Sequence, residues 1–207
     1  MLLRRKAAKF SSLVLTFDDG PGKRLTPAIL KLLAENNAKA TFFLLGRNMV
    51  GREEIVKQIA EQGHEICSHG YDHINYWKVS PLRAIKDIKQ GFKAIDAALG
   101  VQRNRYSFRP PYGKLNIVCL IYLLIYKVPI VYWTVDSGDT WEQQANSCRA
   151  EILVERAGGA VLLAHDFDRR DASLDKFTAD SLRSVLELTK DRRMQTLTVS
   201  EFLTKGR

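Results

Sequence analysis

Two adjacent aspartates, Asp18 and Asp19, directly follow a run of apolar strand formers in the segment LVLTFDDGP. Residues 14–17 have the composition of a short buried strand, and Gly20-Pro21 ends it in a turn. Two carboxylates at the end of a core strand repel each other and lose solvation, so a cationic group is expected beside them. A turn or a helix cap would use the same two residues without any catalytic chemistry.

Three of the four histidines follow predicted strands. His69 and His73 are four residues apart in SHGYDH, a spacing that places two imidazoles on one side of a helical turn or tight loop. Such a pair is also typical of solvated or hydrogen-bonded histidines. With one aspartate of the pair, they would hold a divalent metal ion and leave positions for water, which is a hydrolytic arrangement. His165 follows another apolar run and could act as a general acid, whereas His64 begins a strand and is assigned to structure.

Two further charged residues could support this chemistry. Arg109, in RPPYG, cannot be deprotonated and could grip one of the aspartates bidentately. Asp136, in VDSGDTW, follows another predicted strand, and a carboxylate behind His165 would keep its imidazole protonated. The structural alternatives are a surface arginine before a proline-rich turn and an imidazole satisfied by the backbone.

Strands and helices must position these residues, and the two alternate along the chain. We predict strands over 13–17, 40–45, 64–68, 106–108, 128–135, 159–164 and 195–199. We predict helices over 26–37, 52–62, 80–99, 115–126, 147–157 and 175–190, and a last turn of helix at the C-terminus. Apolar strands that alternate with helices indicate a parallel sheet. The polar residues that follow five of the strands favour a closed or nearly closed βα barrel, because its strand ends converge on one face.

Composition and charge limit the remaining possibilities. The 207 residues suit one domain, and no GxGxxG or GxxxxGK[ST] follows a strand, which disfavours a nucleotide-binding sheet. The net charge of +9 predicts affinity for anionic partners or an anionic membrane face, but no aromatic–basic interleaving suggests a nucleic-acid groove. Three cysteines without a CxxC pair are expected to be buried and reduced: Cys67, Cys119 and Cys148.

The longest apolar run, residues 117–126, is about half of the ~20 residues that a membrane span needs and is predicted to be a buried helix. The N-terminus carries charges without an apolar segment behind them, so the chain as written is expected to be cytoplasmic. If a signal segment has been trimmed, an extracellular or cell-wall location is expected instead.

Five segments, TFDDGP, HGYDH, RPPY, DSGDTW and LLAHD, resemble in order and approximate spacing the five motifs of the NodB-type polysaccharide deacetylases, carbohydrate esterase family 4. The resemblance covers roughly residues 13–200. It implies an N-terminal extension over 1–12 and a single catalytic domain over 13–203, folded as a distorted (β/α) barrel of seven or eight strands. The implied activity is removal of N-acetyl groups from an amino-sugar polymer, an oligosaccharide or a lipid-linked sugar.

The resemblance also implies roles for the matched catalytic positions. Asp18 would be the catalytic base, held by Arg109. His165 would be the general acid, with Asp136 as its tuning partner. The backbone N–H of Tyr112 would help to form the oxyanion hole.

One divalent metal ion is implied as cofactor, zinc first, with cobalt, nickel or iron as alternatives. By the resemblance its ligands would be Asp19, His69 and His73. The substrate pocket would be lined by Pro110, Leu163 and Trp141.

One departure from the family pattern concerns the acyl group. Thr140 stands between Asp139 and Trp141, whereas the family's Trp directly follows the second Asp. A deformylase or another amide hydrolase is therefore an alternative to a deacetylase. Two other classes are a glycan-binding relative without activity and a metal phosphohydrolase, although the latter would need further carboxylates and a phosphate-binding loop.

Overall fold

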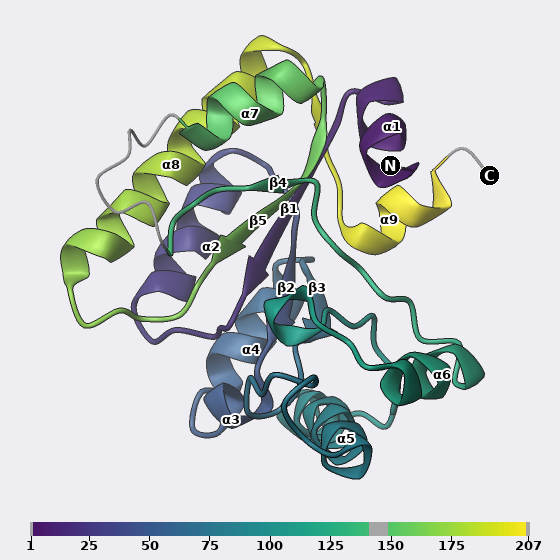
Figure 1. The fold of residues 1–207 in the computed structure, drawn as a ribbon. Helices are drawn as coiled ribbons and strands as arrows, with labels where there is room; N and C mark the ends of the chain where they lie inside the picture. The colour runs from purple at the N-terminus through teal and green to yellow at the C-terminus, as the bar shows by residue number, and fades with distance from the viewer. Residues whose placement is uncertain (1, 141–148, 206–207) are drawn as a thin grey trace.

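A parallel sheet forms the centre of the molecule in the computed structural model, which describes residues 2–140 and 149–205. The strand order is β3-β2-β1-β5-β4, and the short β6 also pairs with the start of β1. The strands are β1 (Ser12–Asp18), β2 (Ala40–Leu44), β3 (Glu65–Ser68), β4 (Val135–Asp136), β5 (Ala160–His165) and β6 (Gln195–Thr196). Every residue of β1 is buried, because this apolar strand lies between β2 and β5 with helices on both sides (Figure 1).

Two isolated bridges carry the pairing beyond β3. Ser68 pairs with Phe108, and Phe108 pairs with Ile130, both in parallel. The segment that begins at Ile130 ends in β4, which pairs with β5. Pairing therefore continues round a full circuit, which is the distorted barrel that the sequence predicts. The predicted strand over 128–135 is only partly regular, because it contacts Phe108 at one end and β5 at the other.

The register of β1 positions the site. Asp18, the last residue of β1, lies opposite His165, the last residue of β5. On the other side, Asp18 lies opposite Phe43 of β2. Because all the strands are parallel, their carboxyl ends lie at the same end of the molecule.

The predicted helices are present with small shifts at their ends. They are α2 (Leu25–Glu35), α4 (Glu53–Glu61), α5 (Pro81–Leu99), α6 (Ile117–Ile125), α7 (Arg149–Ala157), α8 (Ala172–Asp191) and α9 (Val199–Thr204). Three short elements were not predicted: α1 (Leu2–Lys9), α3 (Gly46–Met49) and the 3-10 turn η1 (Pro111–Gly113). α1 packs against β5 and β1, with Ala7 fully buried and Lys6 Nζ donating to the carbonyl of Leu203 at 3.0 Å.

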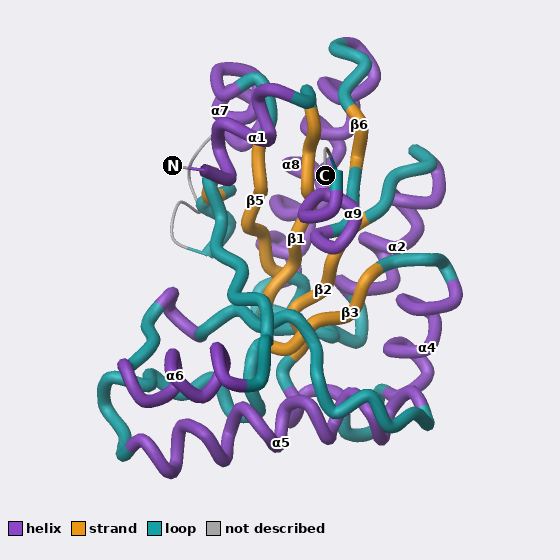
Figure 2. Tube along the Cα trace, turned by 90° about the vertical axis from the view of Figure 1, so that its right-hand side faces the viewer, coloured by secondary structure: helices purple, strands orange, loops and turns teal. Residues whose placement is uncertain are grey.

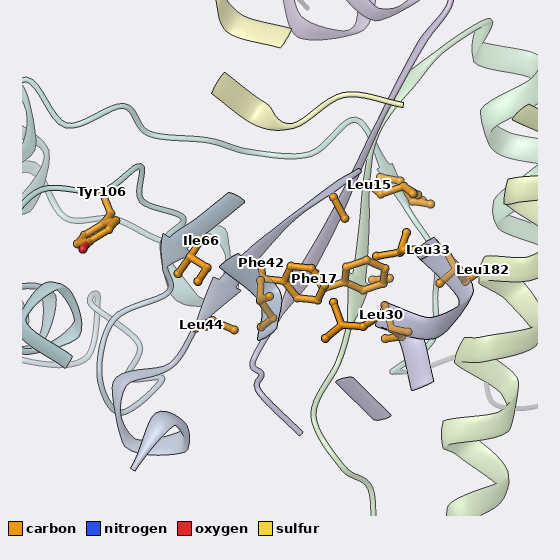
Figure 3. Packing of buried hydrophobic residues seen from close by; sticks show 14 of the residues in the cluster. Leu15, Phe17, Leu30, Leu33, Phe42, Leu44, Ile66, Tyr106 and Leu182 are labelled. Atoms are coloured by element: carbon orange, nitrogen blue, oxygen red, sulfur yellow. The ribbon is translucent and has the colours of Figure 1, made fainter. Parts of the chain in front are cut away.

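The core fills the space between the sheet and the helices around it. Figure 3 shows Phe17 and Phe42 side by side, with ring centroids 5.1 Å apart. Leu30 and Leu33 of α2 and Leu182 of α8 extend this cluster on one side. Cys67 and Cys119 are buried and free, as expected, whereas Cys148 lies outside the described residues.

The prediction of a buried helix over the longest apolar run is wrong. In α6 only Cys119 and Leu123 are buried, whereas Ile117 is 66% and Ile125 is 70% exposed. The helix is apolar all round, but only one of its sides packs against the rest of the molecule. Within the described part of the chain, no helix is both long and apolar enough to cross a membrane.

Candidate active site

A cavity of about 460 Å³ opens at the carboxyl ends of the strands. It is lined by most of the residues that the sequence singled out, namely Asp18, Asp19, His69, His73, Pro110, Tyr112, Asp136, Leu163 and His165. Arg109 is fully buried behind this lining. Trp141 lies outside the described residues, but Thr140, which departs from the family pattern, also lines the cavity.

Asp19, His69 and His73 bring three possible ligand atoms to within 4.8 Å of one another. Oδ1 of Asp19 lies 3.6 Å from Nε2 of His69 and 3.3 Å from Nε2 of His73. This carboxylate oxygen is buried and has no hydrogen-bond partner. A buried, unpartnered carboxylate oxygen facing two imidazole nitrogens is the arrangement that a divalent cation would satisfy.

The protonation state of His69 suits a metal ligand. Its Nδ1 lies 2.8 Å from the carbonyl oxygen of Arg109, which can only accept, so Nδ1 carries the proton and Nε2 keeps its lone pair. Burial lowers the pKa of His69 to about 3 despite the neighbouring Asp19. The imidazole is therefore neutral at physiological pH, and these three residues fit the zinc-type site that the resemblance implies.

Local backbone conformation holds these ligands in place. Asp19 has φ +70° and His73 has φ +56°, both in the left-handed region that residues with a side chain seldom adopt. Nδ2 of Asn48 donates to the carbonyl of Asp19 at 2.7 Å. The His73 ring packs against Tyr112, with centroids 4.5 Å apart.

A further buried carboxylate, that of Asp166, supports the loop that follows Asp19. Its Oδ2 accepts from Oγ1 of Thr26 at 2.6 Å, and its backbone carbonyl accepts from Gly22 N at 3.0 Å. A Cβ atom on Gly20 would lie 2.2 Å from this carboxylate, which explains the glycine of TFDDGP. Burial raises the pKa of Asp166 to about 7.

Arg109 binds Asp18, but through one guanidinium nitrogen rather than bidentately, because Nη2 of Arg109 has no hydrogen-bond partner. Nη1 of Arg109 donates to Oδ1 of Asp18 at 2.7 Å and to Oγ1 of Thr16 at 2.8 Å, and the guanidinium lies over the Phe43 ring at 4.1 Å. Burial raises the pKa of Asp18, and Arg109 opposes this shift. The other oxygen, Oδ2, lies 3.7 Å from Nε2 of His69 and so faces the candidate metal site.

The predicted partner of His165 was wrong. Nδ1 of His165 lies 2.8 Å from Oδ1 of Asp139, and the backbone N–H of His165 donates to the other oxygen of Asp139 at 2.9 Å. Asp136 instead accepts a bond from the N–H of Gly138 within its own turn. Asp139 therefore holds the position that the sequence analysis gave to Asp136.

The Asp139 pair sets the charge of His165. Burial alone would lower the pKa of His165, but Asp139 raises it to about 9. Burial would raise the pKa of Asp139, but His165 and Arg169 lower it to about 2. Oδ2 of Asp139 also accepts from Arg169 at 3.1 Å and from Thr178 at 3.2 Å. His165 is consequently a cation at neutral pH, with a proton to donate at the cavity.

Sequence reasoning missed several residues of the site. Trp133 and Phe167 line the cavity, and Arg169 and Thr178 support Asp139 from behind. Two aspartates in the single segment VDSGDTW were a signal that Asp136 had a competitor. His64, assigned to structure, is buried away from the cavity and its Nδ1 accepts from the N–H of Ala40 at 3.3 Å.

Comparisons with known proteins identify the family of this chain. Residues 5–121 match the family described as polysaccharide deacetylase. A peptidoglycan-N-acetylglucosamine deacetylase from Listeria monocytogenes is 33% identical over 95% of this chain and 40% of its own length. A chitooligosaccharide deacetylase from Azorhizobium caulinodans is 33% identical over 75% of this chain and 74% of its own length. The chain thus spans less than half the length of the Listeria relative.

Solved structures confirm the fold. The Bc1960 peptidoglycan N-acetylglucosamine deacetylase, in complex with 4-naphthalen-1-yl-N-oxidanyl-benzamide, is 31% identical, covers 93% of this chain and 87% of its own, and has a TM-score of 0.84. A mutant of BA3943, a pseudoenzyme of carbohydrate esterase family 4 with restored activity, is 26% identical, covers 94% of this chain and 68% of its own, and has a TM-score of 0.80. The family match covers more than half of the sequence, and the chain belongs to the polysaccharide deacetylase family.

Proposed function

We propose that this chain is a metal-dependent hydrolase that removes the acetyl group from N-acetylglucosamine units of an oligosaccharide or polymer. One observation carries the proposal: the two adjacent carboxylates face different partners. Asp19 faces the imidazoles of His69 and His73, whereas Asp18 is bound by Arg109 and faces the same site with its free oxygen. In the same cavity, His165 is held as a cation by Asp139.

We propose Asp19, His69 and His73 as the ligands of one divalent metal ion, zinc first among several ions that suit this donor set. An ion bound there would act as a Lewis acid on the amide carbonyl and would acidify the attacking water. The remaining steps belong to side chains of this chain.

Asp18 acts as the general base and takes a proton from the water that attacks the acetyl carbon, and its raised pKa makes it a better base. Arg109 keeps Asp18 oriented, because the buried guanidinium donates to one carboxylate oxygen and leaves the other free. The backbone N–H of Tyr112 donates to the oxygen on which negative charge develops. His165 then protonates the sugar nitrogen as the C–N bond breaks, which releases acetate and a free amine.

The walls of the cavity support an acetyl group on a sugar. Leu163 and Trp133 offer apolar surface inside, and Pro110 and Tyr112 lie at the same opening. The peptidoglycan and chitooligosaccharide substrates in the names of the relatives support an oligomer or polymer of N-acetylglucosamine over a lipid-linked sugar. A peptidoglycan substrate would place the enzyme at the cell wall rather than in the cytoplasm.

The experiment measures acetate release from N-acetylglucosamine oligomers and from peptidoglycan. Chelator-treated protein is compared with protein restored with zinc or cobalt, and Asp18→Asn is compared with Asp72→Asn. Asp72 is an exposed carboxylate between the two candidate histidine ligands, so it is a matched control. We expect acetate only with metal, a loss of about 10²- to 10⁴-fold in Asp18→Asn and little change in Asp72→Asn.

Two other results would contradict the proposal in different ways. Tight metal binding without acetate release would point to another acyl group, such as formyl, and the same assay with N-formyl substrates would identify it. Absence of both metal binding and acetate release would favour the non-catalytic relative, a possibility that the BA3943 pseudoenzyme makes concrete within this fold.

A further inference from the structure

An uncovered apolar stripe runs along α6. Ile117, Ile121, Leu124 and Ile125 recur at the spacing of one helical face, and each is between 49% and 70% exposed. The segment 117–126 contains no charged residue. Figures 1 and 2 both show α6 beside α5 at the periphery of the molecule, at the end opposite α1 and α7. Contiguous apolar surface of this kind marks an interaction site.

The same region carries most of the net positive charge of the protein. Residues 73–130 contain ten Lys and Arg and two acidic residues, a net +8 of the chain's +9. Both acidic residues are buried and bonded, Asp87 to Tyr76 Oη at 2.8 Å and Asp96 to Tyr106 Oη at 2.6 Å. Nine of the ten cations are exposed or half-buried: Lys78, Arg83, Lys86, Lys89, Lys93, Arg103, Arg105, Lys114 and Lys127.

Several of these cations frame the apolar stripe. A hollow of about 530 Å³ between α5 and α6 is lined by Lys89, Lys93, Arg105 and Lys127 together with apolar and aromatic residues of α6. Among the described residues that line it, none is acidic. Nζ of Lys89 lies 5.9 Å from the centroid of the Tyr122 ring. Positive side chains thus flank the stripe along one side.

An aromatic residue lies at the other end of the stripe. Trp77 is 65% exposed, its Nε1 donates to the carbonyl of Leu115 at 3.2 Å, and Nζ of Lys114 lies 5.1 Å from its ring. Exposed aliphatic residues on one helix face, bordered by lysines and by a tryptophan or tyrosine, are typical of segments that lie in a membrane interface.

From this arrangement we infer that α6 and its rim of lysines and arginines form a docking surface for an anionic phospholipid bilayer. The positive rim complements anionic headgroups, and the aliphatic stripe would insert at the level of the acyl chains. A second copy of this chain would bring two strongly positive faces together, and protein interfaces are depleted of lysine. The surface therefore suits a bilayer better than another copy of the protein.

Docking would also orient the cavity described above. Tyr112 and Lys114 line the cavity, and the chain continues from them directly into α6. The mouth of the cavity would consequently lie close to the membrane surface. This inference does not depend on deacetylation, because it concerns a surface outside the catalytic residues.

The test is co-sedimentation of the 207-residue chain with vesicles of phosphatidylcholine, either alone or mixed with phosphatidylglycerol. Two double variants probe the surface: Ile121→Glu/Ile125→Glu removes the apolar stripe, and Lys89→Glu/Lys93→Glu reverses part of the rim. The matched controls are Val50→Glu, 68% exposed at the end of α3, and Lys31→Glu on α2. We expect binding to anionic vesicles that falls about tenfold or more in either double variant and is unchanged in the controls.

Three outcomes would overturn the inference. The first is no binding to anionic vesicles, or binding that survives both double variants. The second is a dimer in analytical ultracentrifugation that dissociates in Ile121→Glu/Ile125→Glu, which would assign the surface to a second copy. The third is binding to the soluble polyanion heparin without binding to vesicles.

Folding and activity controls keep these outcomes distinct. Circular dichroism checks each variant, and if Ile121→Glu/Ile125→Glu fails to fold, Lys89→Glu/Lys93→Glu and its salt dependence carry the test. Acetate release from soluble oligomers is expected to be unchanged in all four variants. Failure of membrane docking and failure of the proposed catalytic function would therefore be told apart.

Discussion

His69 and His165 line the same cavity and are both largely buried, yet their pKa values move in opposite directions. Burial lowers the pKa of His69 to about 3. Burial would also lower the pKa of His165, but Asp139 raises it to about 9. The two pKa values differ because of the partner of Nδ1 in each ring. Nδ1 of His69 contacts the carbonyl oxygen of Arg109, whereas Nδ1 of His165 contacts the carboxylate of Asp139.

The comparison shows how one fold assigns two roles to the same side chain. A carbonyl fixes the tautomer without adding charge, so His69 stays neutral and can bind a metal ion through Nε2. A carboxylate stabilises the imidazolium, so His165 keeps a proton that it can donate. The aspartates divide in a related way, because Asp18 contacts the guanidinium of Arg109 whereas Asp19 contacts the imidazoles of His69 and His73.

The largest expected effects come from removing each histidine. His69→Ala should abolish tight zinc binding and, with it, acetate release. His165→Ala should reduce acetate release by about 10²- to 10⁴-fold while zinc still binds, because only the proton donor is lost. Equilibrium dialysis with zinc, alongside the acetate assay, separates the two variants. Equal loss of zinc in both would break the division of roles.

A smaller effect is expected from the partner of His165. His165 must be protonated to act, so activity should fall as the pH rises through about 9. In Asp139→Asn the stabilising charge is gone and burial dominates, so this limit should move below the ordinary value of about 6.5 and activity at pH 8 should fall at least about tenfold. In Asp136→Asn the limit should stay near 9. The pH dependence of kcat/KM in both variants is the measurement, and a shift only in Asp136→Asn would restore the original assignment.

The smallest effect on activity is expected at His64, a buried histidine outside the cavity. Burial lowers its pKa to about 4, so the unfolded chain binds its proton at higher pH than the folded chain. The stabilisation of the folded chain by neutral, buried His64 is fully present above pH ~6.5 and is lost as the pH falls towards 4. His64→Gln should therefore weaken the acid sensitivity of the free energy of unfolding by about 1–3 kcal/mol and leave acetate release within about twofold. Urea denaturation at several pH values checks this, and a large loss of activity would contradict the structural role.

Much of the fold and site could be predicted because it depends on local chemistry. Apolar runs that end in charged residues located the carboxyl ends of the strands, and parallel strands must bring those ends together. The adjacent carboxylates of Asp18 and Asp19 predicted a nearby cation, and for Asp18 this cation is Arg109. Ser80 and Gly100 mark the ends of α5, where Ser80 caps the first turn and Gly100 adopts φ +67°.

The partner of His165 could not be predicted in the same way. Asp136 and Asp139 lie three residues apart in one segment after a strand, and both carry a carboxylate. Asp136 bonds to Gly138 within its turn, which leaves Asp139 to reach back to His165 and Arg169. Arg169 and Thr178 come from distant parts of the chain, so only the folded structure reveals their preference for Asp139.

The prediction that α6 is buried failed for a different reason. Hydrophobic sequence predicts that a helix prefers an apolar environment, but burial depends on which surfaces the fold brings against it. Here the fold covers Cys119 and Leu123 and leaves Ile121 and Ile125 exposed. An apolar helix in an exposed position is the feature that a membrane surface would satisfy.

The most direct test of the account is an NMR titration of the His165 imidazole in chelator-treated wild-type protein, Asp136→Asn and Asp139→Asn. Circular dichroism of the same samples ensures that all three are folded. We expect a pKa near 9 in the wild type and in Asp136→Asn, and a pKa below about 6.5 in Asp139→Asn. An unchanged pKa in Asp139→Asn, or a wild-type pKa near 6.5, would contradict the claim that Asp139 makes His165 the proton donor of the site.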